Sequence, residues 1–94
     1  MNKIKIYDLL DNRPIVEGSI YATDIEENNM WFSYKGTLLP VGEKFRFTIE
    51  FPDSGIVYWG ECLIKSSEIG YYPRSGITLV KKFKKKSEGD NRNA

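Results

Sequence analysis

The chain has 94 residues, a formal net charge of +1, one cysteine and no histidine. This length suits one small domain with shallow surface sites, because a domain of this size buries only about 60–65% of its unfolded surface. The composition excludes histidine-based catalysis, the usual zinc ligand sets and a disulfide framework. We expect Cys62 to be an inert, buried thiol in a reducing compartment.

Charge is divided unevenly along the chain. Residues 1–80 carry eight basic and eleven acidic side chains, a net charge of −3, whereas residues 81–94 carry six basic and two acidic ones, a net charge of +4. A single-stranded nucleic-acid site needs positive potential where the strand runs. The acidic body therefore argues against this kind of site.

Short runs of alternating apolar and polar residues predict strands throughout the chain. The clearest run is 44–51, where phenylalanine and isoleucine alternate with polar residues, and the turn Pro52-Asp53-Ser54-Gly55 then makes a hairpin with the next run. No window has helical spacing. The predicted strands are 3–10, 15–25, 30–34, 44–51, 56–64 and 77–83.

Six short strands predict an all-β fold, a small six-stranded antiparallel barrel over residues 1–83, since closure removes exposed edges. Residues 84–94 are polar and predict a disordered, basic C-terminal tail. No apolar run reaches the length of a signal peptide or the roughly 20 residues of a membrane span. We expect a soluble, cytoplasmic protein.

Four segments resemble a PilZ domain, and together they extend over about residues 3–83. They are Gly18-Ser-Ile-Tyr-Ala-Thr-Asp-Ile-Glu-Glu-Asn-Asn-Met-Trp-Phe32, Leu39-Pro-Val-Gly-Glu-Lys-Phe-Arg-Phe-Thr-Ile49, Gly60-Glu-Cys-Leu-Ile64 and Ser75-Gly-Ile-Thr-Leu79. The resemblance implies a six-stranded barrel that serves as a receptor for the bacterial second messenger cyclic di-GMP. It also implies two ligand motifs, Arg-x-x-x-Arg ahead of the first strand and Asp/Asn-x-Ser-x-x-Gly at the end of the second.

The chain departs from both ligand motifs. Asp24 matches the second motif, but Glu26 replaces its serine and Asn29 its glycine, and no arginine precedes the first strand. Arginine suits phosphates and guanine edges because its planar fork makes paired, charge-assisted hydrogen bonds. Losing two such contacts at about 1.5–3 kcal/mol each would cost roughly two to four decades of affinity. The segment 24–29 is either a remnant of the ligand loop or an ordinary acidic turn, and the turn is favoured because Asn28-Asn29 suits positive φ in a tight hairpin.

These observations leave three hypotheses. The leading one is a non-enzymatic adaptor with a degenerate cyclic di-GMP site, which binds another protein of a bacterial motility or signalling pathway and needs no cofactor. The second is a genuine cyclic di-GMP receptor with a substitute ligand set. The third is an OB-like barrel that binds single-stranded nucleic acid. An enzyme is not expected, because no nucleophile has an adjacent base.

Candidate site residues follow from these hypotheses. The substitute ligand set comprises Lys3, Lys5, Asp24, Glu26, Asn29 and Arg74. The period of two directs Trp31, Trp59 and Leu63 outward, where they would anchor a protein partner or cover the barrel itself. The lysines of 81–86 either keep the chain soluble and protect an edge, or hold an acidic partner or nucleic acid.

Overall fold

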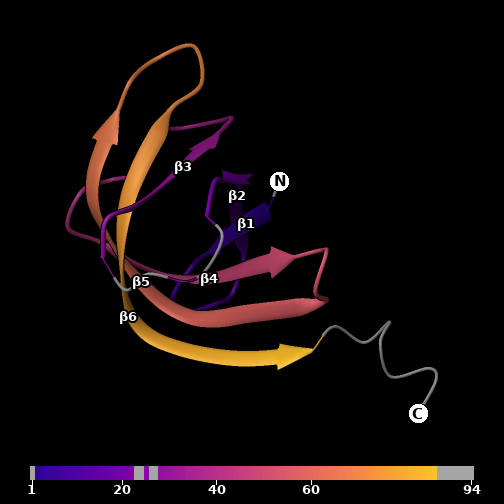
Figure 1. Cartoon of the computed structure of the whole chain (residues 1–94). Coiled ribbons are helices and arrows are strands. Elements are labelled where there is room, and N and C mark those ends of the chain that lie inside the picture. Colours follow the sequence, from indigo (N-terminus) through magenta and orange to yellow (C-terminus); the bar gives the residue numbers. More distant parts are fainter. Residues whose placement is uncertain (1, 23–24, 26–27, 87–94) are drawn as a thin grey trace.

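Six antiparallel strands form the protein, whose structure is a computed structural model describing residues 2–22, 25 and 28–86 (Figure 1). The strands are β1 (Asn2–Tyr7), β2 (Pro14–Ile20), β3 (Met30–Tyr34), β4 (Lys44–Phe51), β5 (Ile56–Glu68) and β6 (Arg74–Lys86). The described residues contain no helix, and hence none that is long and apolar enough to cross a membrane. The predicted all-β class is confirmed.

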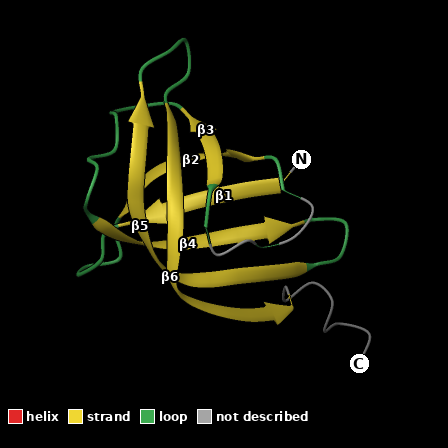
Figure 2. Ribbon diagram, turned by 60° about the vertical axis from the view of Figure 1, so that its left-hand side comes forward, coloured by secondary structure: helices red, strands yellow, loops and turns green. Residues whose placement is uncertain are grey.

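The strands close into a barrel in the order β1-β2-β3-β6-β5-β4. Closure depends on β1, which pairs with β2 on one side and with β4 on the other, from Lys3↔Glu50 to Tyr7↔Arg46. Figure 2 shows β1 and β4 side by side across this seam. The predicted six-stranded antiparallel barrel is thus confirmed.

Alternation along the strands builds the core. Phe45, Phe47 and Ile49 of β4 are buried, whereas Lys44 before them and Arg46 between them are exposed. The other strands contribute the buried side chains Ile4, Ile6, Val16, Ile20, Met30, Phe32, Tyr34, Cys62, Ile64, Ile77 and Leu79. This single apolar interior follows from the period of two in each strand.

The long strands β5 and β6 bend where Gly60 meets β6. Gly60 has φ of +152°, and a Cβ atom there would lie 2.0 Å from the carbonyl oxygen of Lys81. The ladder also shifts register between Glu61 and Cys62, so that Val80 has no partner on β5. Bulges and close-approach glycines increase strand twist and curvature, and here they coincide with the curve of the β5–β6 hairpin in Figure 1.

Two predicted strands are too long at their C-terminal ends. The first ends at Tyr7 because the next residue, Asp8, starts a turn: its carboxylate accepts hydrogen bonds from the amides of Leu10 (3.0 Å) and Asp11 (3.1 Å). Asp favours such local turns over a continued strand. The second predicted strand ends at Ile20 rather than at residue 25.

The last two strands extend beyond their predicted ranges of 56–64 and 77–83. β5 continues to Glu68, β6 begins at Arg74, and the two pair from Glu68↔Arg74 to Ile56↔Lys86. Backbone pairing does not require apolar side chains. The alternation of apolar and polar residues therefore did not predict the polar ends of this hairpin as strand. Part of the predicted tail, residues 84–86, therefore belongs to β6, and residues 87–94 lie outside the described residues.

A ring of hydrogen bonds, buried at Tyr34 and Ser75 and partly buried at Ser67, ties the loop after β3 to β5 and β6. The amide of Leu39 donates to the Tyr34 hydroxyl (2.9 Å), which lies 2.8 Å from Ser75 Oγ. Ser75 Oγ is 2.8 Å from Ser67 Oγ, and Ser67 donates to the carbonyl of Leu39 (2.6 Å). Ser67 uses its only hydroxyl proton on the carbonyl of Leu39, so it must accept from Ser75. Ser75 has then used its own proton, so it must accept from the Tyr34 hydroxyl. Every hydroxyl then donates once and accepts once.

Candidate binding surfaces

The larger surface groove lies beside β3, at the side of the barrel where β2 ends and β4 turns into β5. Its volume is about 1040 Å³. The described residues that line it are Asn2, Ile20, Tyr21, Ala22, Asn29, Met30, Trp31, Phe32, Ser33, Phe51, Asp53, Ser54 and Arg74. The structure thus brings three of the predicted site residues, Asn29, Trp31 and Arg74, to one groove.

Arg74 is the one cation among these lining residues, and its charge is already engaged. Its guanidinium carbon lies 5.0 Å from the centre of the Trp31 ring, and its Nη1 atom lies 3.6 Å from a carboxylate oxygen of Glu68. The groove also contains Asp53. In the described lining of this groove, a ligand with two phosphates would therefore meet one cation, which already has a carboxylate partner, and one further carboxylate.

The two predicted lysines lie elsewhere. Lys5 pairs across the sheet with Glu17, and the Lys5 Nζ atom lies 3.9 Å from its carboxylate. Lys3 lines a smaller groove of about 490 Å³, together with Lys35 and Tyr72. The two grooves adjoin, since Tyr21 and Ser33 line both, whereas Lys5 lines neither of them.

The remaining members of the ligand set belong to the connection between β2 and β3. Asp24 and Glu26 lie outside the described residues. Asn29, just before β3, has φ of +62°, a conformation that asparagine adopts more readily than most residues in tight turns. The positive φ of Asn29 agrees with the interpretation of this segment as an ordinary turn.

The three predicted partner-binding residues differ in how far their side chains are exposed to solvent. Trp31 is half-buried, because its ring lies over Gly76, where an added Cβ would come within 3.0 Å of it. Leu63 is also half-buried. Trp59 is exposed and stacks on Phe83 of β6, with ring centres 4.5 Å apart and planes inclined by 27°. Trp59 is thus the most accessible of the three.

An exposed apolar tip joins β5 to β6, and the sequence did not single it out as a site. Ile69 is 87% exposed and Tyr71 is 93% exposed, at the end of the hairpin that rises above the barrel in Figures 1 and 2. Tyr72 is held more closely, since Lys35 Nζ lies 5.6 Å from its ring centre. The available signal was two large apolar side chains inside a Gly-Pro turn segment, where polar residues are usual.

Comparison of the chain with family models, with curated proteins and with solved structures found no match. Membership of the PilZ family therefore stays a prediction, which depends on the four sequence segments.

Proposed function

We propose that this protein is a non-enzymatic, PilZ-like adaptor that binds another protein of a bacterial motility or signalling pathway through the tip of its β5–β6 hairpin. The observation that carries the proposal is the exposure of Ile69 and Tyr71 on a hairpin that projects from the barrel. Apolar and aromatic side chains are common anchors of protein interfaces, and burying them in a partner's pocket supplies much of the binding energy.

The lining of the larger groove also favours the adaptor hypothesis over the hypothesis of a cyclic di-GMP receptor. Its described lining has one cation, Arg74, which is paired with Glu68, and one anion, Asp53. Tight recognition of two phosphates depends on charge-assisted hydrogen bonds from several unengaged cations or amides. The groove suits weak or no binding of cyclic di-GMP.

The adaptor role is tested by affinity capture with a matched pair of variants. The tagged wild-type protein should recover a specific partner, identified by mass spectrometry, and the double variant Ile69→Ser, Tyr71→Ser should recover at least about tenfold less of it. Leu10→Ser is the control, since Leu10 is 91% exposed but lies in the turn after β1. Equal recovery by the wild type and the double variant would contradict the role of the tip.

The receptor hypothesis is the second candidate, because the groove brings Asn29 and Arg74 together. Calorimetric titration with cyclic di-GMP separates it from the adaptor. We expect no tight binding. Stoichiometric binding that Arg74→Ala abolishes would establish the receptor instead and would overturn a degenerate ligand site.

A further inference from the structure

A row of polar side chains crosses the outer face of the barrel from β1 to β6. Lys3 pairs with Ser19, Ser19 with Ser33, and Ser33 with Arg74 in the three ladders that join these strands. On each of the four strands the next residue along the chain, or the one before, is buried in the interior: Ile4, Ile20, Phe32 and Ser75. The period of two therefore directs the row outward, and with strands about 4.8 Å apart the row is roughly 14 Å long.

The two small side chains in the middle of this row lie in the smaller groove. Ser19 and Ser33 are half-buried, and they line the groove together with Lys3, Lys35 and Tyr72. Because serine is shorter than lysine or tyrosine, the surface is hollow between the longer side chains. The volume of about 490 Å³ falls within the range of roughly 300–1,000 Å³ that is usual for ligand sites.

Two lysines give the smaller groove its positive charge. Lys3 and Lys35 are exposed, and neither forms an ion pair with a described residue. The Nζ atom of Lys35 lies 5.6 Å from the centre of the Tyr72 ring, which is uncharged. Glu17 also lines the groove, but its carboxylate lies 3.9 Å from the Nζ atom of Lys5. The described lining therefore has two cations and one anion, and the anion already has a lysine partner.

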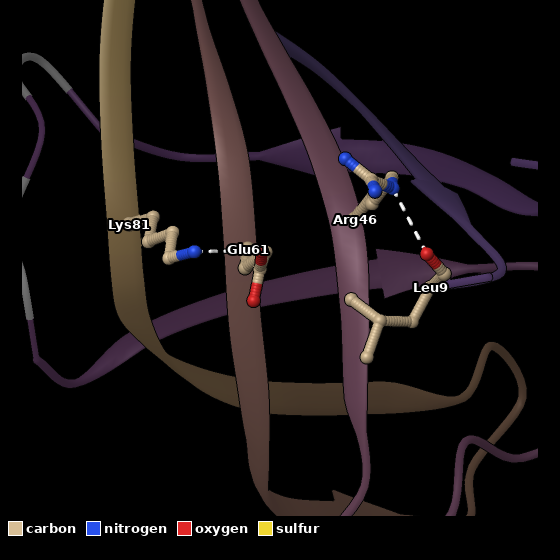
Figure 3. Close-up of polar contacts among 4 residues, drawn as sticks. All are labelled: Leu9, Arg46, Glu61 and Lys81. Carbon is tan, nitrogen blue, oxygen red and sulfur yellow. Dashed lines mark hydrogen bonds and ion pairs between the residues drawn. The ribbon is translucent and has the colours of Figure 1, made fainter.

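Two cations on the outer face of β4, β5 and β6 are engaged more closely. The Nζ atom of Lys81 lies 3.4 Å from a carboxylate oxygen of Glu61, and the Nε atom of Arg46 donates a hydrogen bond of 3.0 Å to the Leu9 carbonyl (Figure 3). A further carboxylate would compete with these partners. The two lysines of the smaller groove have no carboxylate or carbonyl partner among the described residues, so they can accept one without such competition.

The smaller groove continues into the exposed tip of the β5–β6 hairpin through Tyr72. The Tyr72 ring packs edge-on against the Tyr71 ring, with ring centres 4.8 Å apart and planes inclined by 88°. The amide of Tyr34 donates a hydrogen bond of 3.0 Å to the Pro73 carbonyl, so the base of the tip is held against the end of β3. One partner can therefore contact the tip and the groove at the same time.

We propose that the smaller groove binds an acidic, extended segment of the same protein partner that contacts the tip. Lys35 and Lys3 each meet a carboxylate of this segment, and the hydroxyls of Ser19 and Ser33 hydrogen-bond to its backbone. An apolar side chain next to the acidic residues packs on the tip. This inference rests on the adaptor role proposed above, and it adds the chemistry of the partner.

Carboxylates suit the smaller groove better than the phosphates and bases of a nucleotide. Lysine is a compact point charge, and the described lining of this groove contains no arginine, whose planar fork would hold a phosphate or a guanine edge in two hydrogen bonds. A carboxylate needs only one cation. In addition, only an extended ligand reaches both the lysines and the tip.

The test uses a fluorescent peptide, Phe-Ser-Glu-Ser-Glu-Ser-Glu, titrated into the full-length protein at low salt. We expect saturable binding, with amide shifts in NMR spectra of the isotope-labelled protein at residues 3, 18–21, 33–35 and 69–72. The peptide Phe-Ser-Gln-Ser-Gln-Ser-Gln has a similar shape without the charge. It should bind at least about fivefold more weakly, because it forms no ion pair with either lysine.

Matched protein variants locate the site. Lys3→Gln with Lys35→Gln should weaken binding of the acidic peptide at least about fivefold, whereas Lys44→Gln with Lys65→Gln, which removes the same charge from exposed positions of β4 and β5, should change it less than about twofold. Glutamine is used because a glutamate at position 3 would face Glu50 on β4. Thermal unfolding checks that each barrel is intact. The comparison of the two peptides uses the wild-type protein, so it stands even where a variant fails to fold.

Affinity capture separates this inference from the adaptor role. Recovery of the partner by Ile69→Ser, Tyr71→Ser tests the adaptor role, and recovery by Lys3→Gln, Lys35→Gln tests the acidic segment. Loss of the partner by both variants is the expected result. Loss by the tip variant with full recovery by the lysine variant would leave the adaptor role standing and overturn this inference.

Other outcomes of the titration would also overturn it. Equal binding of the charged and uncharged peptides would show that the lysines do not select carboxylates, and amide shifts confined to other residues would place the site elsewhere. Displacement of the peptide by equimolar cyclic di-GMP would assign the groove to a nucleotide, and displacement by oligothymidylate would assign it to nucleic acid. A dimer in ultracentrifugation that the acidic peptide dissociates would assign the groove to a second copy of the chain.

Discussion

At the scale of single residues, the clearest effect of the surroundings on a side chain is the shift in the pKa of the Cys62 thiol. Cys62 is fully buried in the core between Phe45 of β4 and Leu79 of β6, its partners across the two ladders. Burial raises the pKa of the Cys62 thiol from 9.0 to about 12, and a hydrogen bond with the backbone of Phe45 opposes this only in part. Since the thiolate is the reactive species, this thiol is inert at neutral pH.

The raised pKa predicts how Cys62 contributes to stability as pH changes. Because the folded-state pKa lies above the unfolded value of 9.0, the contribution is complete below pH 9 and is lost as pH rises toward 12. Cys62→Ala should lower the free energy of unfolding by about 1 kcal/mol at neutral pH, through lost packing. Urea unfolding of both proteins should show this difference shrinking above pH 9. A difference that stays constant would contradict the burial of a neutral thiol.

Gly60 is the position where an added methyl group is least tolerable. Gly60→Ala would place a Cβ 2.0 Å from the Lys81 carbonyl at φ of +152°, so we expect a loss of about 3 kcal/mol or more in the free energy of unfolding. Gly70→Ala is the control, because the nearest atom, the Tyr72 carbonyl oxygen, lies at 3.4 Å, and it should change stability by less than about 0.5 kcal/mol. Similar midpoints for the two variants in urea would refute the close approach.

At the scale of elements, the hydrogen-bond ring of Tyr34, Ser75, Ser67 and Leu39 joins three strands and a loop. Ser75 is fully buried, and no described buried side-chain oxygen or nitrogen lacks a hydrogen-bond partner. Removing one hydroxyl leaves its neighbours buried with an unmet donor or acceptor, which costs more than the net value of a single hydrogen bond. The ring therefore fixes the loop after β3 against the start of β6.

We expect Ser75→Ala to lower the free energy of unfolding by about 1–3 kcal/mol, as measured in urea. The combined variant with Ser67→Ala should cost less than the sum of the two single changes, since the two hydroxyls are neighbours in one ring. Ser54→Ala is the control, because Ser54 is exposed in the β4–β5 turn and should change stability by less than about 0.5 kcal/mol. Strict additivity of the Ser67 and Ser75 changes would mean that the ring does not act as a unit.

At the scale of the whole molecule, closure depends on pairings between residues far apart in sequence. β1 meets β4 from Lys3↔Glu50 onward, and β3 meets β6 from Met30↔Ile77 onward. The chain loses entropy in closing such long loops before it forms the contacts that compensate for this loss. Barrels of this kind therefore fold slowly.

Refolding should therefore take milliseconds to seconds, as in other small all-β domains. Trp31 reports on the β3–β6 pairing because its ring lies over Gly76, and Phe replacing Trp59 would leave Trp31 as the only tryptophan. Stopped-flow fluorescence of Trp59→Phe follows this closure directly. Refolding within microseconds would indicate that local contacts, and not barrel closure, limit the rate.

The sequence alone determined the strands and their buried faces, because the period of two is a property of neighbouring residues: Phe45, Phe47 and Ile49 point inward in any barrel that buries β4. It could not determine that the β5–β6 hairpin continues to Glu68 and Lys86, since backbone pairing holds those polar ends. Nor could it determine that Arg74 faces Trp31 and Glu68, or that Lys5 lines neither groove. Tertiary structure decided these points, because they depend on which strands meet when the sheet closes, and that is set by the packing of the whole chain.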